Sequence, residues 1–575
     1  MRSVLLSIST ISSLCTITLR AQNDLPIPPL ISGSNIDLQL QEGSWEFHPG
    51  ELIETYGYNG DLLGPTIVLD QGQEVTLNVT NTMPDLTTTH WHGLHVAPEH
   101  DGGPHSLIMP GTTWSPSFTV LDKASTYWYH PHAHGLTDYQ VTKGAAGMII
   151  VRDAEEAALD LPRTYGVDDI PLILQTKPIV DGQIMLHTGL DTVVVTNGVR
   201  EAQVTLPAQI VRLRCLNGSN ERTFLLGFSN GMVFRTIATD GGLLAAPVPL
   251  TRQFLTNGER AEVLLDLGGM EGQVFELMSY GSELPNGTMG SADVSMMGAT
   301  PDAYYENGLN GSDFRVLRIT VGPPTAAPVT TIPAALALVE PYEEADATVT
   351  RQFVFTPEVM GPVGMVEGPI MINGALFEMD VINETVLLGS TEIWTITNNT
   401  AVGHPFHIHD IQFHVLDRNG QPVPPQEQGR KDVVFVPANG TVRVITRFDD
   451  FADPDVPYMY HCHILMHEDE GMMGQFLVVD PNAIGEPSGA GNTLYIAPNP
   501  SSDGSVLFRA AGAEGAAEWV VLDATGRTVA RSTTFLTAPG TTIDLSFLAN
   551  GAYTLQLHPR SGLARTYQAR FILRH

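Results

Sequence analysis

Four His-x-His pairs and one cysteine are the residues most able to do chemistry in this chain. The pairs are His90 and His92, His130 and His132, His407 and His409, and His461 and His463. Cys462 lies inside the last pair, and His467 and Met472 follow within ten residues of it. Imidazole and thiolate groups are ligands for transition metals such as copper and zinc. A lone His-Cys-His could arise by chance in a strand, but the repeated pairs point to metal chemistry.

The spacing around Cys462 predicts two metal sites served by one strand. Successive side chains on a β-strand face opposite ways, so His461 and His463 would point to one side and Cys462 to the other. A thiolate, two imidazoles and a weak axial thioether suit a blue electron-transfer copper. Four residues could supply that set: Cys462, His404, His467 and Met472. Zinc remains an alternative, although structural zinc prefers four closed ligands and would not need this separate set.

The motifs occur in two blocks with the same internal order. THWHG at residues 89–93 precedes YWYHPHAHG at 127–135 and the strand-like GAAGMIIVRD. HPFHIH at residues 404–409 precedes YMYHCHILMH at 458–467 and GMMGQFLVVD. Such a repeat predicts two copies of one β-sandwich domain that donate histidines to a shared site. Residues 165–320 also contain short apolar runs separated by turn-forming residues, but no paired histidines, so we expect that region to be a spacer.

The rest of the chain indicates a multidomain, mostly β protein. Short β-branched runs such as EVTLNV and VRVITRF are separated by Gly, Pro, Asn and Asp, and the 575 residues suffice for three or four domains. Linkers are expected at residues 321–335 and 481–492. The net charge is −34, which argues against nucleic acid as a partner. Residues 490–575 differ, with seven Arg, no Lys and five acidic residues, and predict a separate domain.

The motifs HWHG, WYHPH, HPFHIH and HCHILMHEDEGMM resemble the copper motifs of the multicopper oxidases, in the same order over residues 35–480. The likeness is greatest to the bacterial three-domain branch of laccase-like, bilirubin-oxidase-like and cuprous-oxidase enzymes. It implies an all-β fold with three cupredoxin-like Greek-key β-sandwich domains and a small C-terminal β-sandwich. The expected ranges are residues 30–155, 165–322 without copper ligands, 345–482 with the type 1 copper, and 493–575.

The resemblance also implies four copper ions: one type 1, one type 2 and two type 3. The type 1 ligands would be His404, Cys462, His467 and Met472. His90 and His407 match the type 2 pair, and the type 3 ligands would be His92, His130, His132, His409, His461 and His463. Electrons from a small reducing substrate would pass through Cys462 to the histidine cluster, where dioxygen is reduced to water. Asp101 and Glu468 match family acids that supply protons in this catalysis.

The substrate is less well defined by the sequence. We expect a laccase-like oxidase of phenols or aromatic amines, with a cuprous-ion metallo-oxidase as the alternative. Cuprous oxidases carry a methionine-rich insert, whereas only scattered methionines occur here: Met289, Met296, Met297, Met360, Met365 and Met371. A non-catalytic scaffold of the same fold would have lost ligands, and a two-domain nitrite reductase would not need histidines on both sides of Cys462.

The two ends of the chain predict export. Residues 1–21 read as a secretory signal peptide, although Cys15 leaves a lipoprotein anchor as an alternative. The tail contains APNPSSDG, LDATGR and LANGAY, and resembles the C-terminal sorting domain of type IX secretion, with an ordinary β-sandwich binding module as the alternative. This resemblance implies a partner in the secretion machinery and a secreted or cell-surface location, through the periplasm of a Gram-negative bacterium. We expect a monomer without a transmembrane segment.

Overall fold

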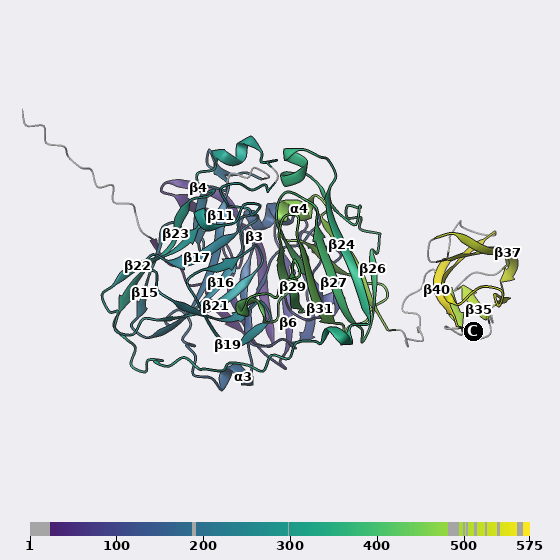
Figure 1. The fold of residues 1–575 in the computed structure, drawn as a ribbon, viewed down its shortest axis with the longest axis horizontal. Helices are drawn as coiled ribbons and strands as arrows, with labels where there is room; N and C mark the ends of the chain where they lie inside the picture. The colour runs from purple at the N-terminus through teal and green to yellow at the C-terminus, as the bar shows by residue number, and fades with distance from the viewer. Residues whose placement is uncertain are drawn as a thin grey trace, which may run out of the picture. The chain divides into compact units, whose positions relative to one another are not determined.

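Alternating apolar residues build two facing sheets in the first third of the chain, as the computed structural model shows (Figure 1). In β6 (Glu74–Asn81), Val75, Leu77 and Val79 are buried while the residues between them are more exposed. One sheet has the order β4 (Glu51–Tyr58), β3 (Asn35–His48), β6 and β7 (Thr113–Trp114), with β8 (Ser117–Thr119) also on β6. The other has the order β2 (Leu30–Ser32), β5 (Thr66–Asp70), β10 (Gly147–Arg152) and β9 (Ser125–Tyr129).

The middle region forms two six-stranded sheets. Their strands β11 (Asp169–Lys177) and β16 (Ile210–Asn217) are buried along their whole length, including Arg212 and Arg214, whose charges are paired with buried carboxylates. Cys215 lies in β16 as a buried free thiol. One sheet has the order β1 (Asn23–Asp24), β15 (Ala202–Pro207), β23 (Asp313–Gly322), β22 (Val274–Tyr280), β17 (Phe224–Phe228) and β20 (Gln253–Leu255). The other sheet has the order β14 (Val193–Thr196), β11, β16, β21 (Arg260–Asp266), β18 (Phe234–Thr239) and β19 (Gly242–Leu250).

The third pair of sheets carries the Cys462 motif. One has the order β25 (Ile370–Ile372), β24 (Val349–Pro357), β27 (Thr391–Asn398), β31 (Thr441–Arg447), β29 (His414–Arg418), and the other β26 (Glu384–Leu387), β33 (Met473–Val479), β32 (Tyr458–Cys462), β28 (His404–Ile408), β30 (Val433–Val436). The register places His407 opposite His461. An isolated bridge joins His90 to His130 in the first region in the same antiparallel sense, so the two sequence blocks share their local pairing.

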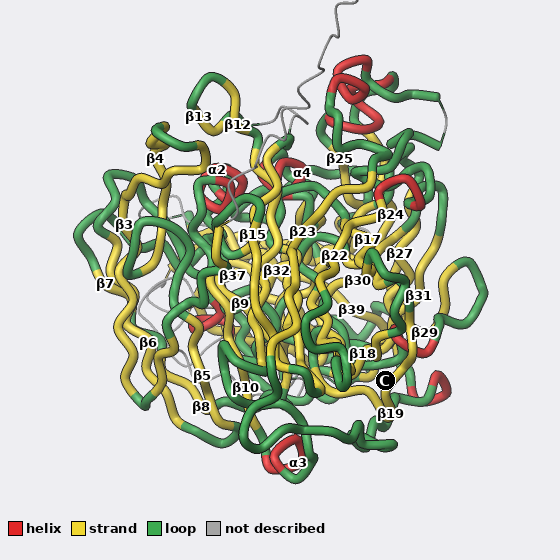
Figure 2. Tube along the Cα trace, turned by 90° about the vertical axis from the view of Figure 1, so that its left-hand side faces the viewer, coloured by secondary structure: helices red, strands yellow, loops and turns green. Residues whose placement is uncertain are grey.

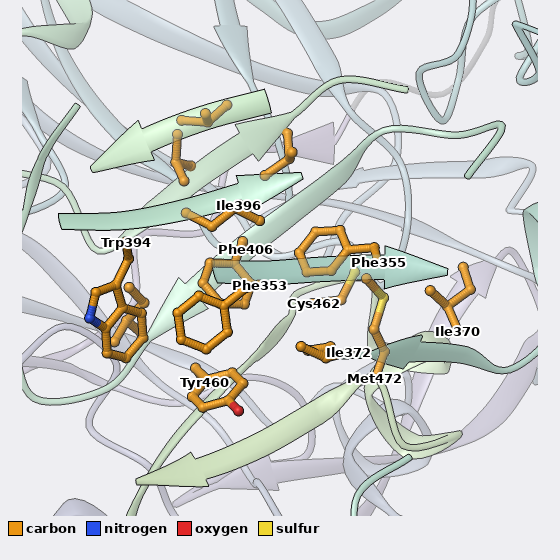
Figure 3. Packing of buried hydrophobic residues seen from close by; sticks show 14 of the residues in the cluster. Phe353, Phe355, Ile370, Ile372, Trp394, Ile396, Phe406, Tyr460, Cys462 and Met472 are labelled. Carbon is orange, nitrogen blue, oxygen red and sulfur yellow. The ribbon is translucent and has the colours of Figure 1, made fainter. Parts of the chain in front are cut away.

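A single core, which includes Phe353, Phe355, Trp394 and Phe406, fills the space between the third pair of sheets (Figure 3). Cys462 and Met472 are part of this core and are fully buried. The metal motif is therefore built into a rigid apolar interior, where few side-chain movements are open to its ligands.

In the described part of the chain the α-helices are short: α1 (Pro98–Asp101), α2 (Thr137–Thr142), α3 (Ala154–Ala157) and α4 (Leu465–Asp469), the last three of which are labelled in Figure 2. The first and third regions meet through two of them, because Asp469 of α4 accepts hydrogen bonds from the backbone N–H of Thr137 (3.1 Å) and Asp138 (2.9 Å) of α2. Among the described residues, no helix is both long and apolar enough to cross a membrane.

The structure describes residues 23–186, 191–296, 298–480, 494–497, 501, 504–510, 515–523, 526–536, 541–560 and 567–574. The expected signal peptide and the expected linker at residues 481–492 lie outside them. The chain divides into two units, Met1–Pro481 and Asn482–His575. The described residues of the second unit contain a core of their own and two sheets. The first sheet has the order β34 (Leu494–Ala497), β35 (Ser505–Ala510) and β38 (Thr541–Asp544). The second has the order β37 (Thr528–Leu536), β36 (Gly515–Asp523), β39 (Gly551–Pro559) and β40 (Tyr567–Leu573). The all-β prediction is confirmed.

Candidate metal centre

Cys462, at the end of β32, lies between two histidines. Its Sγ atom is 3.5 Å from Nδ1 of His404 and 3.8 Å from Nδ1 of His467, and all three residues are buried. The other ring nitrogens have partners: Nε2 of His404 lies 2.8 Å from Thr400 Oγ1, and Nε2 of His467 lies 3.0 Å from the Val366 carbonyl. Donation by Nε2–H of His467 to this carbonyl leaves its Nδ1 lone pair directed at the sulfur, as a metal ligand requires.

Burial shifts the pKa values of the Cys462 thiol and the His467 imidazole towards their uncharged forms. It raises the pKa of the Cys462 thiol, although a hydrogen bond from the Ile464 backbone N–H to Sγ (3.4 Å) opposes the shift. It also lowers the pKa of His467 to about 4, so the imidazole is neutral. The thiolate therefore forms when a metal ion replaces its proton. Figure 3 shows the Met472 side chain beside Cys462, where an axial thioether would lie.

The four His-x-His pairs converge on a second buried group. Nε2 of His132, His409 and His461 lie 3.1 to 3.3 Å from one another. Nδ1 of His92 is 3.4 Å from Nε2 of His130, and His463 completes this second triplet. Nε2 of His90 and of His407 are 3.5 Å apart. The structure thus brings these eight histidines together as two triplets and one pair, and they are the residues that the family resemblance assigns to type 3 and type 2 copper.

Hydrogen bonds to backbone carbonyls orient four of these rings. In each ring Nδ1–H is the donor, which leaves Nε2 free as a ligand. The pairs are His90 with Asp101 O (2.9 Å), His407 with Asp432 O (2.8 Å), His130 with Pro131 O (2.8 Å) and His461 with Cys462 O (2.8 Å). His92 is reversed: its Nε2 lies 3.1 Å from the carboxylate of Asp432, and its Nδ1 faces the centre.

These histidines fit metal ions rather than a network of hydrogen bonds. Burial lowers the pKa of His130 to about 3, and it lowers the pKa of His132 and His409 well below the usual range, so the rings are neutral. Since Asp101 accepts from Nδ1 of His409 (2.8 Å), its Nε2 carries a lone pair that faces His132 and His461. In the part of the chain that the structure describes, neither ring nitrogen of His463 has a hydrogen-bond partner. A bound cation satisfies both features.

Comparison with known proteins identifies the family of this chain. Residues 39–156 and 341–482 each match a family model described as multicopper oxidase. The multicopper oxidase mco of Staphylococcus epidermidis is 32% identical over 457 residues, which cover 78% of this chain and 89% of that protein. The chain belongs to the multicopper oxidase family. The cell division protein FtsP of Sodalis glossinidius is also 32% identical, over 80% of this chain and 93% of that protein.

Among solved structures, the laccase-like multicopper oxidase CueO of Ochrobactrum sp. matches with a TM-score of 0.70 and 34% identity, over 79% of this chain and 100% of that chain. The Cys462 group and the histidine cluster correspond to the type 1 and trinuclear copper sites of a multicopper oxidase. The protein is an oxidoreductase that acts on oxygen, and the prediction of copper cofactors is confirmed. Copper therefore replaces the zinc alternative.

Both acids predicted to supply protons contact the copper-binding rings. The carboxylate of Asp101 lies 2.8 Å from Nδ1 of His409 and 3.4 Å from Nδ1 of His90. Glu468 lies 3.4 Å from Nδ1 of His132 and 3.1 Å from Nδ1 of His461. Burial disfavours the Glu468 carboxylate, but the two imidazoles outweigh it and lower the pKa to about 2. Each acid therefore bridges two rings of the trinuclear site.

Sequence reasoning missed a third acid, Asp432, and a glycine of the middle region. Asp432 directly precedes β30 and contacts His92 and His407. Its only signal was a charged Lys-Asp pair next to the apolar VVFV, which suggests buried charge. Gly258 lies in the turn between β20 and β21 with φ of +79°, and a Cβ built there would be 2.9 Å from the His463 ring. The middle region supplies no histidine ligand, yet it forms one wall of the site.

Proposed function

We propose that this multicopper oxidase is laccase-like and oxidises phenols or aromatic amines, one electron at a time, with dioxygen as the final acceptor. The observation that carries the proposal is the complete set of imidazoles and one thiol, buried and oriented as described above. The Ochrobactrum relative, described as active towards lignin model compounds and lignosulfonate, supports an aromatic reductant.

Bound copper would supply one-electron transfer at the Cys462 group and reduction of dioxygen at the histidine cluster. The chain supplies the connection, because Cys462 is bonded directly to His461 and His463, which face the cluster. The hydrogen bond from Nδ1 of His461 to the Cys462 carbonyl (2.8 Å) adds a second link between the two groups. β32 is held on both sides by β28 and β33, which keeps this connection rigid.

Asp101 and Glu468 would deliver the protons that dioxygen reduction consumes. Each carboxylate is buried and reaches two rings of the trinuclear site, so a proton that it relays arrives next to the place where oxygen is reduced. The proposal predicts that their loss affects the oxygen half of the cycle and leaves oxidation of the reductant unchanged.

The surroundings of His467 suit an aromatic reductant. Its Nε2–H donates to Val366, within a π-helical turn over residues Val363–Glu367. Val363, the first residue of this turn, is 63% exposed, and Val359, four residues before it, is 59% exposed, so both offer apolar surface near the residue that holds His467. Glu367 is half-buried, and burial raises the pKa of its carboxyl group. A carboxylate with a raised pKa is a suitable acceptor for the proton that a phenol loses on oxidation.

Cuprous-ion oxidation is the second candidate because two of the scattered methionines between residues 289 and 371 are exposed. Met360 and Met296 are 74% and 57% exposed, and the Met296 backbone N–H donates to Ala401 (3.1 Å), three residues before His404. Thioethers are suitable ligands for Cu(I). Met289 and Met365 instead belong to the buried core, and Met297 lies outside the described residues.

Oxygen uptake by the copper-loaded protein, with a simple phenol and with Cu(I) compared, separates these candidates. Faster uptake with the phenol supports the laccase-like proposal, and preference for Cu(I) replaces it with the metallo-oxidase. Absence of uptake with either reductant would favour a non-catalytic scaffold. A Cys462→Ser protein, which cannot form the type 1 site, is the control for uptake that does not depend on it.

We further propose that the C-terminal unit is a type IX secretion sorting domain, which would place the oxidase outside the cell. The motifs LDATGR and LANGAY support this, and in the first the backbone N–H of Arg527 donates to the carboxylate of Asp523 (3.1 Å). Expression of full-length and Pro481-terminated chains in a bacterium with type IX secretion tests the proposal. We expect only the full-length chain at the surface or in the medium, and equal export of both would contradict it.

A further inference from the structure

One carboxylate-bearing residue, Asp432, orients two copper-binding histidines by different means. Its side chain accepts from Nε2 of His92 (3.1 Å), and its backbone carbonyl accepts from Nδ1 of His407 (2.8 Å). The first contact turns His92 so that Nδ1 faces the centre, and the second turns His407 so that Nε2 does. Because His92 belongs to a type 3 set and His407 to the type 2 pair, displacement of Asp432 would disturb two copper positions together.

Arg260 of the middle region holds Asp432 in place. Its Nη1 lies 2.6 Å from Oδ1 of Asp432 and its Nη2 lies 2.5 Å from Oδ2, a two-pronged contact between planar groups. Both side chains are buried, so water does not compete for this contact. Arg260 begins β21, whereas Asp432 precedes β30, and the pair therefore joins the middle and third regions beside the copper cluster.

All the guanidinium donors of Arg260 are used. The three that do not reach Asp432 bind backbone carbonyls: Nε binds Thr126 of the first region (3.0 Å), Nη1 binds Gly258 (3.0 Å) and Nη2 binds Asp240 (3.1 Å). A guanidinium has five N–H donors in a fixed plane. Contacts to all three regions therefore fix the position of the Arg260 guanidinium group, and through it the position of the Asp432 carboxylate.

Neighbouring charges leave Asp432 dependent on Arg260. The adjacent Lys431 pairs instead with Asp240 (2.9 Å) and Glu259 (3.0 Å). Arg260 instead faces both carboxylate oxygens of Asp432 and leaves Oδ1 within reach of His92 Nε2. A lysine at position 260 would keep the positive charge but could not reproduce the planar fork.

We propose that Arg260 is a positioning residue for the trinuclear copper site. It acts through Asp432, which fixes the ring orientation of His92 and His407, although the middle region provides no copper ligand. The proposal depends on copper binding at the histidine cluster and is independent of the reductant. Loss of an outer hydrogen-bond partner of a metal ligand commonly lowers metal affinity or activity about 10- to 100-fold.

Arg260→Lys tests the proposal, with Arg214→Lys as the matched control. Arg214 is also buried in the middle region and makes a two-pronged contact with Asp169 (2.7 and 3.0 Å). In the part of the chain that the structure describes, no interaction joins Arg214 or Asp169 to a copper-binding histidine. Copper per chain, the type 1 colour and the type 2 electron paramagnetic resonance signal would be measured on both full-length proteins.

For Arg260→Lys we expect an unchanged type 1 colour, an altered type 2 signal and copper affinity at the trinuclear site lowered about 10- to 100-fold. Arg214→Lys should retain the wild-type copper content and type 2 signal. The same disturbance in both variants, or a wild-type signal and full copper in Arg260→Lys, would overturn the proposal. If Arg260→Lys does not fold, Asp432→Asn decides, because an amide N–H₂ would face a guanidinium N–H. A wild-type type 2 signal in that variant would equally overturn it.

Discussion

Gly258→Ala should damage the type 3 copper site from a residue that binds no metal. Gly258 has φ of +79°, in the left-handed region that an alanine enters at a cost of about 1–2 kcal/mol. A Cβ at this position would also lie 2.9 Å from Cδ2 and 3.0 Å from Nε2 of His463. Contacts this short require a shift of the ring, and overpacking of a rigid interior costs a further 1–3 kcal/mol, approximately. We expect a total loss of stability of roughly 2–5 kcal/mol.

Gly269→Ala separates the two contributions. Gly269 has φ of +74°, and a Cβ there would have no atom within 4 Å, so only the backbone cost of about 1–2 kcal/mol remains. Thermal unfolding, copper content and the rate of reoxidation by dioxygen would be compared for both variants and the wild type. We expect slow reoxidation and loss of copper from the trinuclear site in Gly258→Ala alone. Four coppers and wild-type reoxidation in Gly258→Ala would refute the reasoning that this contact positions His463.

Four further changes test other parts of the molecule. Cys462→Ser should remove the blue colour and the oxidase activity while the trinuclear copper signals remain, and a blue, active variant would exclude Cys462 as the type 1 ligand. Asp101→Asn should slow reoxidation by dioxygen about 100- to 10,000-fold without slowing type 1 reduction, as stopped-flow absorbance would show, and unchanged reoxidation would remove Asp101 from proton delivery. Glu367→Gln should slow phenol oxidation but not oxidation of a reductant that loses no proton, and equal effects on both would contradict its role as acceptor. Burial lowers the pKa of Lys177 from 10.5 to about 7, so between these pH values the unfolded chain holds a proton that the folded chain lacks, and stability rises with pH. Lys177→Met should therefore stabilise the protein most near pH 7. The difference in free energy of unfolding between the variant and the wild type should shrink by at most about 1.4 kcal/mol per pH unit as pH rises. A difference in thermal unfolding that does not depend on pH would exclude this account.

The sequence predicted the copper-binding groups well because their signals are local and repeated. A two-residue spacing on a strand places both histidines of a pair on one face, and it separated Cys462 from His461 and His463 correctly. The repeat then related the two blocks, and the structure pairs His90 with His130 as it pairs His407 with His461. These features follow from strand geometry, which a short stretch of sequence expresses directly.

The residues that orient the histidines lacked such a signal. Arg260 and Asp432 are 172 positions apart, and the His92 contact with Asp432 spans 340 positions. A lone arginine at the start of one strand and an aspartate before another have no periodicity that relates them. Their partnership depends on how the sheets are packed, and it becomes visible only when the three regions are seen together.

The middle region, expected to be a spacer, contributes to the copper cluster through groups other than ligands. Histidines of the first and third regions meet at the cluster. Their relative positions therefore depend on contacts that link these two regions to each other. Arg260 provides one by binding the first region at Thr126 and the third at Asp432. A buried ion pair is costly to desolvate and is a poor source of net stability. Its value here lies in geometry, because an apolar replacement could fill the same space without directing the carboxylate of Asp432 at His92.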